Sequence, residues 1–170
     1  EEFGVAIVND ISGGSLDKNM FQTVADLQVP YILMHMKGIP QTMQNNPMYD
    51  LLVRDIFLYF AEKVSELCQL GVNDIVLDPG FGFAKNLSHN YELLNYISDF
   101  SIFDLPLLVG FSRKSMIYQL LENTPSEALN GTTVLNTIAL LQGAQILRVH
   151  DVREAVEAVK IVETMKQAKR

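Results

Sequence analysis

The sequence predicts a parallel α/β fold, because short apolar runs alternate with longer stretches of helical periodicity along the whole chain. Five runs are apolar on consecutive positions, which is typical of strands buried on both faces of a parallel sheet. No low-complexity stretch or linker interrupts the pattern, so we expect residues 1–170 to form a single domain. The expected strands are Val5–Asn9, Tyr31–Met34, Asp74–Leu77, Leu107–Val109 and Gln145–Arg148.

Helical spacing of apolar residues predicts the segments between the strands. The longest, Asp50–Leu70, ends at Gly71, and Ser126–Gln142 ends at Gly143, since glycine commonly follows a helix. Five strand–helix units on pattern alone favour an open, doubly wound sheet, because a closed (β/α) barrel needs eight units. The remaining expected helices are Leu16–Leu27, Tyr91–Ile97, Lys114–Leu121 and Val152–Lys169.

Composition excludes some functional classes. The formal net charge of −7 argues against a nucleic-acid partner, and no apolar run is long enough to predict a membrane span. We see no signal-peptide pattern at the start and expect a cytoplasmic protein. The single cysteine, Cys68, excludes an internal disulfide, and its apolar helical surroundings predict a place in the core.

Reactive side chains follow all five expected strands. In parallel α/β folds, ligands bind at the carboxyl ends of the strands, so five such ends suggest one shared site, although helix caps alone would explain some of them. The groups are Asn9-Asp10, His35, Asp78-Pro79-Gly80, Ser112-Arg113-Lys114-Ser115 and Arg148-Val149-His150-Asp151.

Asn9 and Asp78 carry the chemistry of a heterocycle site. A carboxamide offers a donor and an acceptor to a lactam edge, and a carboxylate accepts from ring and amino N–H groups. Phe81 or Phe83 could pack on a ring beside Asp78. The alternatives are a turn or helix cap at Asn9-Asp10 and an ordinary Pro-Gly turn after Asp78.

The last two strand ends carry cations. Lys114 and the hydroxyl groups of Ser112 and Ser115 open a helix and suit an anion or a carbonyl group, unless they form a capped helix with solvated charges. Arg148 and His150 lie two positions apart, share a face if the strand continues, and can donate to a diphosphate. Their alternative is a salt bridge with Asp151.

The remaining histidines do not indicate a metal site. His35 lies between two methionines with no His or Cys near it in sequence, so it is more often structural. His89 lies in a polar segment and is interpreted as a turn or cap residue.

Four segments together resemble the dihydropteroate synthase family, in the family order and with family-like spacing over essentially the whole chain. They are Leu33–Gly38 (LMHMKG), Asp78–Lys85 (DPGFGFAK), Gly110–Ser115 (GFSRKS) and Arg148–Val152 (RVHDV). Pterin-binding methyltransferase domains are similar in their barrel and pterin contacts, but they are not expected to carry the last two segments.

The resemblance implies a role for each matching residue. Asn9, Met34, Asp78, Phe83, Gly110 and Lys114 would form the pterin site, and Ser115 would lie near the p-aminobenzoate carboxylate. Arg148 and His150 would bind the departing diphosphate, so that Lys114, Arg148 and His150 are the implied catalytic residues. The implied reaction displaces diphosphate from a dihydropterin methyl diphosphate by the amine of p-aminobenzoate, with Mg2+ on the diphosphate.

The resemblance also implies a full (β/α)8 TIM barrel for the family, of which this chain matches about the last five β/α units. Family residues for diphosphate, metal and loop closure lie in earlier segments, so we expect the 170-residue chain to be inactive alone. A homodimer through the later helices is also implied.

Three functions stay open at this point. The first is the synthase, which binding of p-aminobenzoate or a sulfonamide would favour. The second is a pterin-binding module that serves methyl transfer. The third is a half barrel that only completes a fold with another chain.

Overall fold

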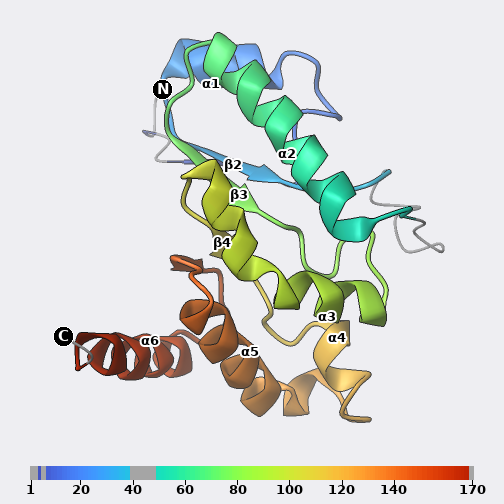
Figure 1. Ribbon diagram of the computed structural model, residues 1–170, viewed down its shortest axis with the longest axis vertical. Helices are drawn as coiled ribbons and strands as arrows, with labels where there is room; N and C mark the ends of the chain where they lie inside the picture. Colours follow the sequence, from blue (N-terminus) through green and yellow to red (C-terminus); the bar gives the residue numbers. More distant parts are fainter. Residues whose placement is uncertain (1–3, 5–6, 39–48, 169–170) are drawn as a thin grey trace.

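The described residues form alternating strands and helices in one continuous α/β arrangement (Figure 1). The structure is a computed structural model that describes residues 4, 7–38 and 49–168. Figure 1 shows α1 and α2 toward the N-terminal end of the molecule and α5 and α6 toward the C-terminal end. The elements are β1 (Val8–Asp10), α1 (Met20–Leu27), β2 (Tyr31–Met34), α2 (Leu52–Gln69), β3 (Ile75–Asp78), α3 (Leu87–Asn95), η1 (Ile97–Phe103), β4 (Leu108–Val109), α4 (Ser115–Tyr118), η2 (Pro125–Glu127), α5 (Leu129–Leu141), β5 (Ile146–Leu147) and α6 (Val152–Gln167).

The described strands lie in the order of the chain. β1, β2 and β3 form one parallel sheet, and β4 and β5 form a second parallel pair. A parallel bridge between Leu77 and Leu107 joins the two sheets. A doubly wound sheet reverses its strand order at a switch point. The described strands have no such reversal, so the open sheet favoured by the pattern alone is not supported.

One face of the strands is covered by helices and forms the main core. Side chains alternate between the two faces of a strand, and Leu33, Leu77 and Val109 on this face are fully buried among helix residues. Four phenylalanines tie α2 to η1, with ring centroids 4.8–6.4 Å apart. They are Phe57, Phe60, Phe100 and Phe103. Residues that point to the opposite face, such as Met34, Asp78 and Leu108, are also largely buried.

The predicted strands match the structure closely, whereas the helix boundaries differ. β2 has the predicted bounds, and Val5 of the first predicted strand lies outside the described residues, as does Lys169 of the last helix. The predicted helix Leu16–Leu27 begins only at Met20, because turns formed by residues 11–16 precede it.

Three further expectations were wrong. The predicted helix Tyr91–Ile97 begins earlier, at Leu87, because the Asn86 side chain accepts from the His89 N–H and caps it. The 3-10 segment η1 was not predicted. Cys68 is exposed because it follows the buried Leu67 by one position and so turns away from the core.

In the described part of the chain, no helix combines the length and apolar character needed to cross a membrane.

We predict that Phe60→Ala lowers the free energy of unfolding by about 3–5 kcal/mol, because Phe60 is fully buried among aromatic rings and its loss leaves a cavity. Urea denaturation followed by circular dichroism measures this change. Leu58→Ala on the same helix, at an exposed position, should change stability by less than about 0.5 kcal/mol. Equal effects of the two substitutions would contradict the placement of the core.

Candidate active site

The sheet register places the predicted pterin residues on one face. Neighbours in a parallel ladder point to the same side, and Asn9 pairs with Ile32 while Met34 pairs with Asp78. The bridge between Leu77 and Leu107 sets β4 so that Leu108 and Gly110 share the face of Asp78. This face, opposite the helix-covered core, is the candidate site.

An ion pair crosses this face from one strand end to another. Arg148 follows β5, and its Nη1 lies 2.9 Å from Oδ2 of Asp78 at the end of β3. Asp78 is almost completely buried, whereas about a third of the Arg148 side chain is exposed. The contact lacks hydrogen-bond geometry, so Oδ2 and Nη1 both lack a hydrogen-bond partner. A buried acceptor beside a cation can receive the N–H groups of a ligand.

Gly110 makes the ion pair possible. Arg148 reaches over β4 to Asp78, and a Cβ atom at Gly110 would lie only 3.2 Å from Nη2 of Arg148 and 3.5 Å from its Nε. A larger residue would push the guanidinium away from the carboxylate. Gly110 therefore leaves space for the guanidinium, and its predicted contact with the pterin stays a prediction.

The segment Pro79–Lys85, which we call the β3–α3 loop, is folded tightly around Asp78. The Gly80 N–H donates to Oδ1 of Asp78 at 2.8 Å, so only Oδ2 remains directed at the site. Gly80 has φ +71°, and a Cβ there would lie 2.1 Å from the carbonyl oxygen of His35, so only glycine fits. The Pro-Gly turn is therefore present after Asp78, and the ligand role of Asp78 stays a prediction.

Lys114 covers the β3–α3 loop from the side of the site. Its Nζ donates to the carbonyl oxygen of Phe81 and lies 4.8 Å from the centroid of the Phe83 ring. Burial lowers the pKa of Lys114 to about 8; the charge of Asp78 opposes this shift and that of Arg148 adds to it. The side chain is not the solvated charge of the alternative interpretation. It brings an ammonium group with a near-neutral pKa beside Asp78.

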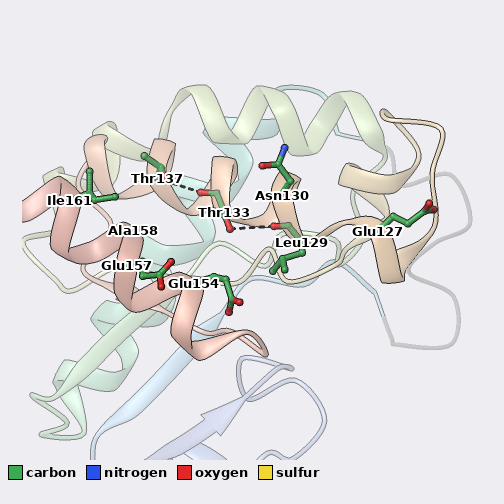
Figure 2. A pocket seen from close by; sticks show the side chains of 9 residues that line it. All are labelled: Glu127, Leu129, Asn130, Thr133, Thr137, Glu154, Glu157, Ala158 and Ile161. Carbon is green, nitrogen blue, oxygen red and sulfur yellow. Dashed lines mark hydrogen bonds between the residues drawn. The ribbon is translucent and has the colours of Figure 1, made fainter.

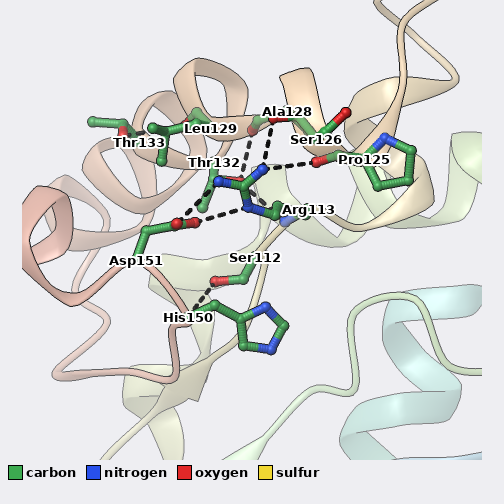
Figure 3. A network of polar contacts seen from close by, with 10 residues as sticks. All are labelled: Ser112, Arg113, Pro125, Ser126, Ala128, Leu129, Thr132, Thr133, His150 and Asp151. Carbon is green, nitrogen blue, oxygen red and sulfur yellow. Dashed lines mark hydrogen bonds and ion pairs between the residues drawn. The ribbon is translucent and has the colours of Figure 1, made fainter.

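Arg113 holds the last two strand ends together (Figure 3). Its Nε and Nη2 donate to the two oxygens of Asp151 at 3.1 and 3.0 Å, and its Nη1 donates to the carbonyl oxygens of Pro125 and Ser126. The His150 N–H donates to Oγ of Ser112, and Figure 3 shows the imidazole pointing away from Asp151. Asp151 therefore pairs with Arg113, and the salt-bridge alternative for Arg148 and His150 is wrong.

The structure separates Asn9 from Asp10. Asn9 is exposed on the site face, whereas the Asp10 carboxylate accepts from Ser12, Gly14 and Tyr31 at 2.7 Å. Burial acts to raise the pKa of Asp10, but these hydrogen bonds outweigh it and hold the pKa below its usual value. The turn interpretation is right for Asp10, and the ligand role of Asn9 stays a prediction.

The other predicted site residues differ in exposure. Met34 is fully buried, Phe83 and Ser115 are half-buried, and His150 is exposed. β5 ends at Leu147, so strand pairing does not by itself place Arg148 and His150 on one face.

Two buried groups were not assigned to the site from the sequence. The side chain of Lys85, the last residue of the β3–α3 loop, is buried, and its Nζ lies 3.1 Å from Nδ1 of His35. Lys85 belongs to a segment quoted for the resemblance, but a lysine near a loop normally indicates a solvated charge. Only the packing around it shows otherwise.

The described residues do not fit a protein-held magnesium ion. They contain no group of three or more His, Cys, Asp or Glu side chains that could hold a metal. Mg2+ prefers oxygen ligands, whereas Oδ2 of Asp78 is paired with the Arg148 guanidinium and Asp78 also acts electrostatically on Lys114. Donors of this kind suit a negatively charged ligand.

Comparisons with known proteins fit this geometry. The sequence pattern of the family described as pterin binding enzyme matches residues 1–150. Because this match covers most of the 170 residues, the chain belongs to the pterin-binding enzyme family.

The relatives narrow this assignment to one type of enzyme. The chain is 49% identical over 168 residues to the dihydropteroate synthase of Escherichia coli K12, which covers 98% of this chain and 59% of that protein. It is 36% identical to the folate synthesis bifunctional protein of Arabidopsis thaliana, over 95% of this chain and 36% of that protein. The chain therefore spans less than two thirds of the length of these relatives.

Solved structures give the same result. A Yersinia pestis dihydropteroate synthase with a sulfonamide drug complex superposes with a TM-score of 0.94 at 45% identity, over 98% of this chain and 61% of that one. The Thermus thermophilus dihydropteroate synthase, solved in complex with 6HMPPP, gives 0.91 at 33% identity, over 97% and 66%.

We predict that Gly80→Ala is more destabilising than Gly71→Ala. Both residues have positive φ, which costs a non-glycine residue about 1–2 kcal/mol, but only Gly80 meets a backbone atom. The clash with His35 should add ~1–3 kcal/mol. Thermal and urea unfolding of both variants measure the difference. Equal losses would show that the β3–α3 loop is not packed against β2 as described.

Proposed function

We propose that this chain provides the pterin and diphosphate sites of a dihydropteroate synthase. The reaction joins a (7,8-dihydropterin-6-yl)methyl diphosphate to p-aminobenzoate and releases 7,8-dihydropteroate and diphosphate. The observation that carries the proposal is the buried Oδ2 of Asp78, which has no hydrogen-bond partner and lies 2.9 Å from Arg148. A pterin offers adjacent N–H donors to such an acceptor, and its diphosphate offers oxygens to the arginine.

In this proposal, different residues contact different parts of the substrate. Asp78 and Asn9 accept and donate along the pterin edge, with Met34 and Phe83 against the ring. Lys114 would donate to the carbonyl side of the pterin. In the ligand-free structure its Nζ donates to the backbone carbonyl oxygen of Phe81, which a ligand can replace as the acceptor. Ser115, the first residue of α4, would donate its hydroxyl to the carboxylate of p-aminobenzoate in this proposal.

Catalysis in this proposal rests on stabilising the leaving group. The bond from the pterin methylene carbon to oxygen breaks, both electrons leave with the diphosphate, and the amine nitrogen of p-aminobenzoate forms the new bond and loses a proton. Arg148 and His150 donate to the diphosphate oxygens as negative charge develops on them, which lowers the barrier. The side chain of Arg148 is available for this because its ion pair with Asp78 lacks hydrogen-bond geometry.

The fold proposal follows from the strand order. Sequential parallel strands with one face covered by helices are what a (β/α)8 barrel requires, and we assign residues 1–170 to about its last five units as a single domain. Magnesium enters this proposal only with the diphosphate, because the described residues supply no ligand set for it. The proposed site of action is the cytoplasm.

We expect the 170-residue chain to bind the dihydropterin diphosphate saturably in a calorimeter. Asp78→Asn should weaken binding about a hundredfold, since it removes the charged acceptor of two N–H groups. Arg148→Ala should weaken it about tenfold but should not weaken binding of a dihydropterin that lacks the diphosphate.

Arg153→Ala serves as the matched control, because Arg153 is an exposed cation on α6 and should leave both affinities unchanged. A folded chain that binds no dihydropterin, or an Asp78→Asn variant that binds normally, would overturn the proposal. Circular dichroism on every variant checks the fold.

A pterin-binding module for methyl transfer is the second candidate, and the cation cluster argues against it. Methyl transfer releases no diphosphate and needs neither Arg148 beside Asp78 nor the Ser112-to-Ser115 segment. A calorimetric titration with p-aminobenzoate in the presence of diphosphate and a pterin separates the two functions, because only the synthase should bind it.

We also propose a homodimer through α5 and α6. A groove of about 650 Å3 lies between these helices (Figure 2), and α6 exposes apolar side chains along it and beside it, including 69% of Ile161. Exposed apolar surface of this kind marks an interface between proteins. The groove is lined by Glu127, Leu129, Asn130, Thr133, Thr137, Glu154, Glu157, Ala158 and Ile161.

Ile161→Glu should shift the chain from dimer to monomer in sedimentation velocity, because it places a charge in the apolar contact. The control is Leu58→Glu on α2, an exposed apolar residue far along the chain from the groove, which should leave the dimer intact. A wild-type chain that sediments as a monomer at every concentration would refute the dimer.

A further inference from the structure

A buried amino group, that of Lys85, donates to backbone carbonyl oxygens of the β3–α3 loop. Nζ of Lys85 donates to the carbonyl oxygens of Gly80 at 3.0 Å and Phe83 at 3.1 Å, and it lies 3.1 Å from Nδ1 of His35. Only 3% of Lys85 is exposed. Three acceptors around one nitrogen match the three N–H donors of an ammonium group.

His35 supports this amino group from the end of β2. Its ring is buried and packs edge-on against Tyr59, with centroids 4.9 Å apart, and its backbone N–H donates to the carbonyl oxygen of Asp78. Burial, reinforced by the charges of Lys85 and Lys37, holds the pKa of His35 well below its usual value. The imidazole is therefore neutral, and Nδ1 can accept a hydrogen bond from Lys85.

The buried cation has no carboxylate within ion-pair distance in the part of the chain that the structure describes. An uncompensated buried charge is costly, and burial lowers the pKa of Lys85 to about 7, with Asp78 opposing the shift and Lys114 adding to it. A buried lysine with a lowered pKa, close in sequence to the proposed ligand site, is a candidate for a functional role.

The role follows from the contacts of Gly80. Its carbonyl oxygen accepts from Nζ of Lys85 and from the Phe83 N–H, both at 3.0 Å, and its own N–H donates to Oδ1 of Asp78 at 2.8 Å. Because Gly80 is held at both ends, the carboxylate of Asp78 cannot rotate freely. Its second oxygen, Oδ2, is consequently the one that faces Arg148 and the site.

We propose that Lys85 is a positioning residue for the pterin site: supported by His35, it fixes Gly80 and thereby directs Oδ2 of Asp78 at the ligand. The identity of the ligand rests on the proposed function, whereas the positioning of the carboxylate does not. The arrangement works in either protonation state. The ammonium donates to His35, and the neutral amine still donates to both carbonyls and accepts from an Nδ1–H tautomer of His35.

Amide hydrogen exchange on the ligand-free 170-residue chain tests the positioning directly. In Lys85→Met, the Gly80 amide should exchange at least about tenfold faster, while amides in the centre of α2 keep their wild-type rates. Lys63→Met is the matched control, since Lys63 is a surface lysine paired with Glu66. An unchanged Gly80 rate, or equal acceleration of Gly80 and α2, would overturn the inference.

A substitution at His35 provides a second variant that preserves the lysine. His35→Asn keeps an oxygen acceptor near the position of Nδ1, and His35→Leu removes it. We expect Gly80 exchange near the wild-type rate in the first variant and faster exchange in the second. The same rate in both variants would exclude His35 as the support.

A double-mutant cycle on dihydropterin affinity links the positioning to binding. If Lys85 acts through Asp78, Lys85→Met weakens binding, and adding it to Asp78→Asn changes the affinity by no more than about twofold. Losses that multiply would refute the link. A wild-type chain that binds no dihydropterin would instead refute the proposed function, and the exchange experiment would still decide the role of Lys85.

Discussion

The carboxylate of Asp78 is the constraint on which the rest of the site depends. It is almost completely buried at the end of β3, and the Gly80 N–H satisfies one oxygen while the other faces Arg148. The neighbouring glycines are explained by this arrangement. Gly80 allows the turn that supplies the N–H, Gly110 leaves room for Arg148, and Gly82 leaves room for the side chain of Lys114.

The basic residues Arg148, Lys114 and Lys85 differ in their exposure and in their contacts. Arg148 is partly exposed and pairs with Asp78. Lys114 donates to the carbonyl oxygen of Phe81, and the buried Lys85 donates to that of Gly80. Burial lowers the pKa values of both lysines toward neutrality, to about 8 and about 7. Both lysines therefore lose their positive charge more readily near neutral pH than a surface lysine does, although basic side chains gather near one carboxylate in a chain of formal net charge −7.

Sequence patterns predicted the strands and their parallel pairing and named candidate site residues, because short apolar runs and strand ends are local signals. They failed where packing decides. Nothing local shows that Asp151 pairs with Arg113, since 38 positions separate the two residues. Cys68 was placed in the core because helical spacing alone cannot resolve a one-position difference at the edge of an apolar face. The burial of Lys85 depends on His35, which lies 50 positions away.

Under the proposed function, the ion pair between Asp78 and Arg148 also affects how the pterin substrate binds and how the product leaves. In the ligand-free chain the guanidinium occupies the place beside Oδ2. A pterin that carries a diphosphate offers Arg148 a new partner as it enters, whereas a pterin without one must leave the arginine unpaired. Under the proposed function, contacts with the substrate would replace this ion pair, and the ion pair would form again after the diphosphate leaves.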